Sequence, residues 1–139
     1  MDGEAMVQYL LSQGVQPQNI LIHGWSLGGG VGAHVAALHQ EKGKEIHICN
    51  DRSFESMVNE VKELARELRK YINTSTLLGK LVSAALALAP ITIPLIHMIG
   101  WDFKSTQCYQ KINGHKFIIY HPNDEIIVYS ASLHKNWRI

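Results

Sequence analysis

The residues best suited to chemistry lie in a short glycine-flanked run that contains one serine. Residues 24–28 read GWSLG and fit the pattern G-x-S-x-G, after an apolar run and before a glycine-rich stretch. A serine on a tight turn from a strand to a helix carries its hydroxyl above the sheet, and the next backbone amide faces the position of a carbonyl oxyanion. Gly24 and Gly28 would avoid collisions across such a turn. Ser26 is therefore the candidate nucleophile and the Leu27 amide the candidate oxyanion donor, and the alternative is an ordinary tight turn.

The elements that must position this serine alternate between strands and helices. Apolar runs predict strands at residues 20–23, 45–49 and 116–120. Helical periodicity predicts helices at residues 2–13, 33–40, 54–71, 105–112 and 130–137. This alternation is typical of an α/β fold in which helices flank a parallel sheet. Three strands make a thin sheet, and both its faces and its edges need cover.

One apolar segment stands apart from this pattern. Residues 81–100 carry few polar side chains and approach the roughly 20 residues that a membrane-spanning helix needs. Pro90 and Pro94 interrupt the segment, and each removes a helix hydrogen bond and clashes with the preceding turn. We therefore predict a buried or lid-like pair of short helices broken at the prolines, in an insert over approximately residues 77–104. Contact with a membrane is the less favoured alternative.

Composition limits the class of protein. The chain has 139 residues, 46% hydrophobic and 18% charged, so one folded domain over residues 1–139 is expected. The formal net charge of +1 argues against a nucleic-acid partner. Two cysteines, Cys49 and Cys108, are too few for a disulfide scaffold or a structural zinc cluster, and the histidine spacing predicts no metal site. Residues 1–4 lack the start of a secretory signal, which favours a cytoplasmic location.

The GWSLG run and its surroundings resemble the α/β-hydrolase superfamily, which includes serine lipases, esterases and thioesterases. Upstream, residues 5–18 look like the helix that precedes the nucleophile strand. Downstream, residues 46–54 read IHICNDRSF and look like the next strand and its loop. Residues 116–128, KFIIYHPNDEIIV, resemble the strand and loop that present the triad acid. The resemblance covers most of the chain except the apolar insert, and it implies no metal and no organic cofactor.

The resemblance assigns roles to particular residues. It makes Ser26 the nucleophile of a catalytic triad and implicates Asp124 as the acid that orients the base. Because the family's chain order is serine, acid and then histidine, His134 is the candidate base, the sole histidine after Asp124. Trp25 and His23, next to the nucleophile, are candidate substrate contacts. Two structural alternatives stay open: Asp124 could serve ordinary turn chemistry, and His23 could be a buried histidine with satisfied hydrogen bonds.

The chain also departs from the family's pattern in two ways. The family places several strands and a second oxyanion loop before the helix that begins here. Its histidine normally follows the acid by a further helix, strand and loop. The sequence therefore predicts a partial hydrolase domain that lacks those N-terminal strands and the usual C-terminal histidine. Without a base, a serine hydroxyl is a poor nucleophile near neutral pH.

The function expected from the resemblance is hydrolysis of a carboxylic ester of lipid or acyl type through an acyl-enzyme, with a small-molecule ester or lipid as substrate. One alternative is a non-catalytic hydrolase remnant or interaction module, whose exposed apolar surface would favour self-association. Another is a dinucleotide-binding fragment that uses G-x-G-x-x-A at residues 28–33, with Asp51 on the ribose. Residues 24–27 separate these glycines from the strand, which counts against the dinucleotide hypothesis.

Overall fold

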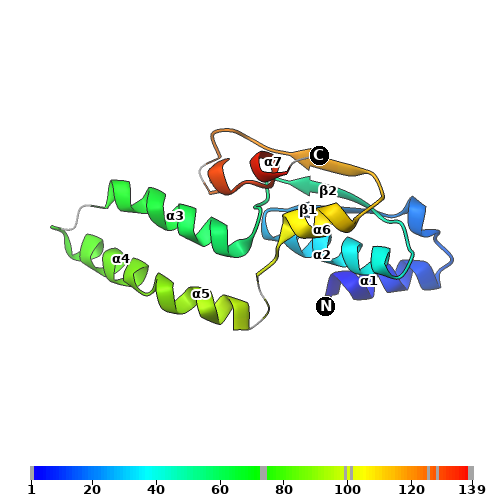
Figure 1. Cartoon of the computed structure of the whole chain (residues 1–139), viewed down its shortest axis with the longest axis horizontal. Helices are drawn as coiled ribbons and strands as arrows, with labels where there is room; N and C mark the ends of the chain where they lie inside the picture. Colours follow the sequence, from blue (N-terminus) through cyan, green and yellow to red (C-terminus); the bar gives the residue numbers. More distant parts are fainter. Residues whose placement is uncertain are drawn as a thin grey trace.

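A computed structural model gives the fold and describes residues 2–72, 75–98, 100, 102–124, 126–127 and 129–137. Helices and strands alternate along the chain, with two short 3-10 helices, η1 and η2 (Figure 1). The elements are α1 (Asp2–Ser12), η1 (Pro17–Asn19), β1 (Leu21–Trp25), α2 (Leu27–Glu41), β2 (His47–Asp51), α3 (Met57–Tyr71), α4 (Leu77–Ala87), α5 (Ala89–Met98), α6 (Ser105–Lys111), β3 (Lys116–Ile119), η2 (Tyr129–Ala131) and α7 (Leu133–Asn136).

The three strands form one parallel sheet in the order β1-β2-β3. Their register places Trp25 beside Asp51 and Asp51 beside Ile119, so the carboxyl ends of all three strands meet at one edge. The expected α/β architecture with a small parallel sheet and flanking helices is therefore confirmed. Within the described residues, β1 and β3 are the two edges of this sheet.

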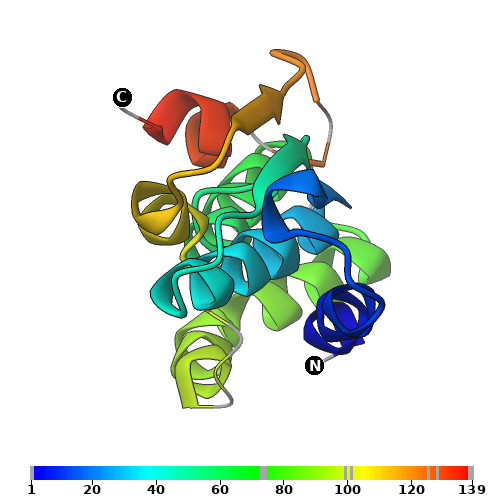
Figure 2. The same ribbon diagram turned by 90° about the vertical axis from the view of Figure 1, so that its right-hand side faces the viewer.

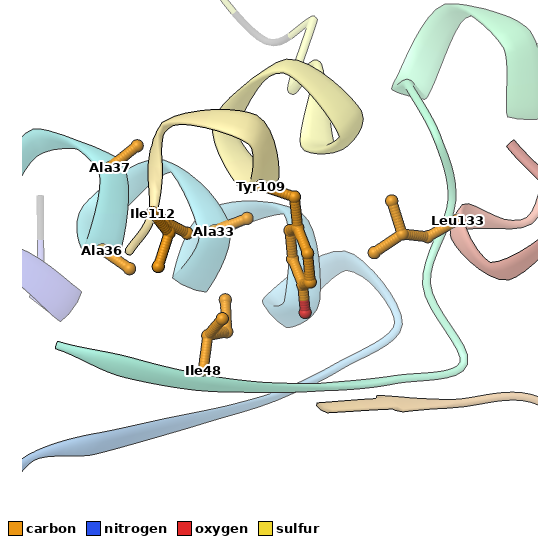
Figure 3. Packing of buried hydrophobic residues seen from close by; sticks show 7 residues of the cluster. All are labelled: Ala33, Ala36, Ala37, Ile48, Tyr109, Ile112 and Leu133. Atoms are coloured by element: carbon orange, nitrogen blue, oxygen red, sulfur yellow. The ribbon is translucent and has the colours of Figure 1, made fainter. Parts of the chain in front are cut away.

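One face of the sheet carries the core. Helix α2 packs against this face, and α1 and α6 pack against α2 (Figures 1 and 2). Small alanines let α2 approach β2 closely, and the side chains of α6 fill the space beside them (Figure 3). The Tyr109 hydroxyl points at the sheet and donates a hydrogen bond to the carbonyl of Phe117, 3.3 Å away. The main cluster consists of Ala33, Ala36, Ala37, Ile48, Tyr109, Ile112 and Leu133.

The opposite face of the sheet has much less cover. Side chains alternate between the two faces of a strand, so Leu21 and Trp25 of β1 share this side with Phe117 and Ile119 of β3. These four side chains are between 49% and 63% exposed. Parallel sheets ordinarily bury both faces, so this surface is an unusually large apolar exposure for a sheet of this kind.

Helix α2 begins at Leu27, six residues before the predicted start at residue 33. The glycine-rich stretch was expected to precede the helix because glycine weakens helices. Packing overrides that preference here. A Cβ built on Gly29 would lie 2.5 Å from Oδ1 of Asn50, and one built on Gly32 would lie 2.9 Å from a methyl group of Ile22. The glycines let the first turns of α2 lie directly on β1 and β2.

The apolar insert forms α4 and α5, which run alongside α3 and extend with it away from the sheet (Figure 1). The predicted break at Pro90 is close to the observed one, because α5 starts at the preceding residue. The predicted break at Pro94 is wrong, since Pro94 lies inside α5. Its missing amide would have bonded to the carbonyl of residue 90 in the first turn, so only that one bond is lost there. Within the described residues, no helix combines the length and apolar character needed to cross a membrane.

Candidate functional site

The predicted turn at Ser26 is present, and its backbone is strained. Ser26 joins β1 to α2 with φ of 52° and ψ of −119°, a conformation that costs an ordinary side chain about 1–3 kcal/mol. Two hydrogen bonds hold it there. The Ser26 amide donates to the carbonyl of Asp51 at 2.9 Å, and the Ser26 carbonyl accepts from the amide of Gly29 at 3.0 Å. The first bond ties the turn to the end of the neighbouring strand, so the strain is maintained by the sheet itself.

The two glycines of the motif have different roles. A Cβ built on Gly24 would contact the backbone carbonyl of Gly28 and lie 2.6 Å from Cα of Gly29. Both neighbours are backbone atoms that cannot rotate away, so Gly24 is required where β1 meets α2. A Cβ on Gly28 would meet no described atom within 4 Å. The collision expected at Gly28 is therefore absent, because its Cα faces outward from the first turn of α2.

The Leu27 amide lies where an oxyanion donor is expected. Leu27 is the first residue of α2, and the first amides of a helix have no carbonyl of their own helix to bond. The positive end of the helix dipole adds to their attraction for a negative oxygen. Leu27 itself is 44% exposed.

A polar cluster surrounds the elbow at the carboxyl edge of the sheet. The Arg52 guanidinium donates through Nε to the Asp51 carboxylate at 3.1 Å and lies over the Trp25 ring, 5.7 Å from its centre. His23 Nε2 lies 3.6 Å from the other Asp51 oxygen. Arg52 also has a positive φ, 46°, and its amide donates to the carbonyl of Ile119 at 2.8 Å. The candidate substrate contacts Trp25 and His23 are thus joined through Asp51 and Arg52.

Asp124 and His134 come together in a separate place. Both line a small pocket of about 10 Å³ with Arg52 and Tyr120, at the lower limit for one water molecule. The Asp124 carboxylate accepts hydrogen bonds from the amides of Ile126 and Ile127 at 2.9 and 2.8 Å. The His134 ring stacks on Tyr120, with ring centres 3.5 Å apart. Asp124 therefore stabilises its own turn, and an aromatic stack fixes the orientation of His134.

The predicted triad is not connected by direct contacts. Among the described residues, no hydrogen bond or ion pair joins Asp124 to His134, or either of them to Ser26. Arg52 links the two places, since it lines the small pocket and follows Asp51, whose carbonyl holds the elbow. The assignment of Asp124 and His134 to a triad remains a prediction.

A second, larger depression lies close to Ser26, beside His23 and Gly28. A groove of about 300 Å³ runs along the free edge of β1 between α1 and α2, and His23 and Gly28 form its end nearest Ser26. The rest of its lining is mainly apolar, with Met6 and Leu21 at its open side. Its size is at the lower end of the range for small-molecule sites, about 300–1,000 Å³.

Other reactive groups provide no second site. Burial raises the pKa of the Cys49 and Cys108 thiols, which keeps both protonated and weakly nucleophilic. No group of three metal-ligating side chains is close enough to hold a metal ion in the part of the chain that the structure describes. Comparisons of the chain with protein-family models, with curated proteins and with solved structures gave no match.

Asp51 and Arg52 lie beside Ser26, and sequence reasoning assigned neither of them a role in ester hydrolysis. The dinucleotide hypothesis used Asp51 as a ribose contact. Alternation in the second strand could have pointed to Asp51, because residues 47, 49 and 51 share a face. The carboxyl ends of neighbouring parallel strands meet at one edge, so Asp51 had to lie near Ser26 once the two strands were paired.

Proposed function

We propose that this chain is a serine hydrolase acting on carboxylic esters with an apolar acyl group. The observation that carries the proposal is the backbone of Ser26, a strained non-glycine residue between a parallel strand and a helix. Strain of this kind persists only where the surrounding structure maintains it, and it is concentrated at functional sites. Ser26 would attack the ester carbonyl, and the Leu27 amide would donate to the resulting oxyanion.

The substrate class follows from the groove beside the elbow. An ester whose carbonyl lay at Ser26 could extend its acyl chain past Gly28 into the apolar groove along β1. Burial of each methylene contributes roughly 0.8 kcal/mol, so such a groove favours long acyl chains over acetyl groups. Collapse of the oxyanion would break the ester C–O bond and release the alcohol, which takes up the proton that Ser26 gave to the base. Water would then release the acyl group from Ser26 as a carboxylic acid in the second step.

The proton must move from Ser26 to a base, and we assign that role to His134 with Asp124 as its partner. Both line a small pocket together with Arg52, and Arg52 in turn pairs with Asp51 beside Ser26. The histidine nearest to Ser26 in sequence is His23, which already faces the Asp51 carboxylate. His23 therefore serves as the matched comparison for His134 in any test of the base.

The dinucleotide hypothesis receives less support from the same geometry. A pyrophosphate-binding fingerprint needs a glycine at the turn that leaves the strand. Ser26 occupies that turn here, and Gly28 and Gly30 lie within α2. Asp51, the proposed ribose contact, is engaged by Arg52. An elbow serine therefore accounts better for the turn than a phosphate loop does.

Labelling of the full chain with a fluorophosphonate probe tests the proposal. The wild type should form a covalent adduct on Ser26, and Ser26→Ala should form none. His134→Gln should lower the rate of labelling by about a hundredfold or more, whereas His23→Gln should change it only slightly. Circular dichroism of each variant shows that the chain is folded.

Two outcomes would contradict parts of this proposal. A folded wild type that resists labelling would favour the non-catalytic hydrolase remnant, for which the lack of contact between Ser26 and His134 is the specific support. Labelling that is lost in His23→Gln but kept in His134→Gln would move the role of base to His23 and Asp51.

A further inference from the structure

We infer that α4 and α5 form a docking surface for the face of an anionic lipid membrane. The inference concerns the helical arm formed by α3, α4 and α5, which extends from the sheet in Figure 1. It does not depend on the chemistry of Ser26. The argument starts from the exposed side chains of the arm.

An apolar stripe runs along α5 and begins just before it. Leu88, Ile91, Leu95 and Met98 follow one another at intervals of three and four residues, so they lie on one side of the helix. Their exposed fractions are 54%, 67%, 49% and 80%. Leu77, at the start of α4, is 77% exposed. Side chains this exposed face away from α3, and large apolar patches of this kind mark an interaction site.

The arm carries charged and apolar surfaces on different helices. Exposed Lys62, Arg66 and Lys70 follow one another at intervals of four residues on α3, and the last two pair with glutamates of the same helix. Helix α3 contacts α5, which carries the apolar stripe. A unit that combines a charged helix with an apolar one suits the boundary between water and lipid, as a single amphipathic helix does.

Charge favours an anionic surface as the partner. Between Glu67 and Asp102 the sequence contains no carboxylate, whereas it contains Arg69, Lys70 and Lys80. Lys80 lies on α4 and is exposed. Each basic side chain beside an apolar surface strengthens the binding of anionic lipids about fivefold. The stripe would enter the boundary between head groups and acyl chains, while Lys80 of α4 remains among the head groups.

A lipid surface fits the arm better than a second copy of the chain. A helix that pairs with one partner carries a narrow apolar stripe and polar residues on the rest of its surface. Residues 81–96 contain no ionisable residue, and the ionisable residues of α4 and α5 are Lys80, near the start of α4, and His97, near the end of α5. This pattern suits an extended hydrocarbon environment more than a single helix–helix seam.

Vesicle co-sedimentation of the full chain tests the inference. Wild type should bind vesicles made of equal parts phosphatidylcholine and phosphatidylglycerol, and salt should weaken this binding. The combined variant Ile91→Gln, Leu95→Gln and Met98→Gln should lose affinity about a hundredfold, because three apolar side chains no longer enter the lipid. A control with Tyr9→Gln and Phe117→Gln, exposed apolar residues outside the arm, should bind like wild type.

Two further variants identify the part of the chain that causes the binding. Lys80→Gln should weaken binding to the anionic vesicles about fivefold and leave the weaker binding to pure phosphatidylcholine unchanged. Ser26→Ala should bind like wild type, so failure of the hydrolase proposal would leave this inference intact. The inference is overturned if the folded wild type does not bind the anionic vesicles, or if the triple glutamine variant binds as well as wild type. It is also overturned if light scattering without lipid shows a dimer that the triple variant abolishes.

Discussion

The elbow at Ser26 and the loop that carries Asp124 differ in how their geometry is fixed. The elbow lies between a strand and a helix that are adjacent in sequence, and its amide bonds to the neighbouring strand. Asp124 follows the last strand, and the two amides bound by its carboxylate belong to its own turn. The turn at Ser26 is stabilised by a hydrogen bond to the neighbouring strand, whereas the turn at Asp124 is stabilised by hydrogen bonds within the turn.

This difference shows which part of the proposed site depends on local structure. The turn at Ser26 needs one parallel pair of strands and a helix, and the structure describes all three. The segments that carry Asp124 and His134 have positions that depend on everything packed around them. Arg52 adjoins both places, since it pairs with Asp51 and lines the pocket of Asp124 and His134.

The largest expected effect is on the elbow and is a loss of stability. Gly24→Ala should destabilise the fold by about 3 kcal/mol, because the new methyl group would collide with the backbone of α2. Gly28→Ala is the matched control. Its methyl group meets nothing within 4 Å, so alanine in the first turn of a helix should be neutral or add up to about 1 kcal/mol. Urea denaturation measures both values, and equal losses would show that β1 and α2 do not approach as described.

The next effect concerns the acid loop. Asp124→Ala should cost about 1–3 kcal/mol, because two amides lose their acceptor. Asp124→Asn retains an oxygen that can accept both bonds, so its stability should remain within about 1 kcal/mol of wild type. If Asp124 also acts in the triad, Asp124→Asn should still slow fluorophosphonate labelling. An asparagine variant with wild-type stability and wild-type labelling would leave Asp124 with its turn role alone.

A smaller effect tests the strain at the elbow. Ser26→Gly should raise the free energy of unfolding by about 1 kcal/mol, because glycine adopts a positive φ without a steric penalty. Ser26→Ala retains a Cβ and should show no such gain. Equilibrium denaturation of the two variants gives the difference directly. A glycine variant that is less stable than the alanine variant would contradict the strain assigned to Ser26.

The smallest effect concerns pH and separates the base from the fold. Burial lowers the pKa of His39 below its usual 6.5, and neither ring nitrogen has a hydrogen-bond partner in the described part of the chain. Protonation therefore favours the unfolded chain, whose histidine keeps the higher pKa. Stability should be fully present above about pH 6.5 and should decline as the pH falls through the lower pKa of the folded state. His39→Gln should flatten this decline in denaturation midpoints measured over a pH series, and it should leave fluorophosphonate labelling of Ser26 at neutral pH unchanged.

Local patterns were sufficient for several features of the fold. The alternation of strands and helices predicted a parallel α/β sheet, and G-x-S-x-G marked the turn at Ser26. The amphipathic run that became α3 was clear because its charges and its apolar residues separate at helical spacing. These features depend on neighbours a few residues apart, which a sequence displays directly.

Other features depended on contacts between distant residues. Local patterns did not predict that α2 begins at Leu27, because glycines are favourable in this helix only where β1 and β2 pack closely against it. It also could not show that Pro94 is accommodated inside α5.

The sequence by itself determined the elbow, the order of the elements and the apolar character of α4 and α5. Only the tertiary structure decided that Asp51 and Arg52 adjoin Ser26, that Asp124 and His134 share a different pocket, and that the stripe on α5 is exposed. The physical reason is the distance along the chain over which the interactions act. Backbone conformation and helix faces follow from residues that are close in sequence, whereas the contacts of a side chain depend on how whole elements pack.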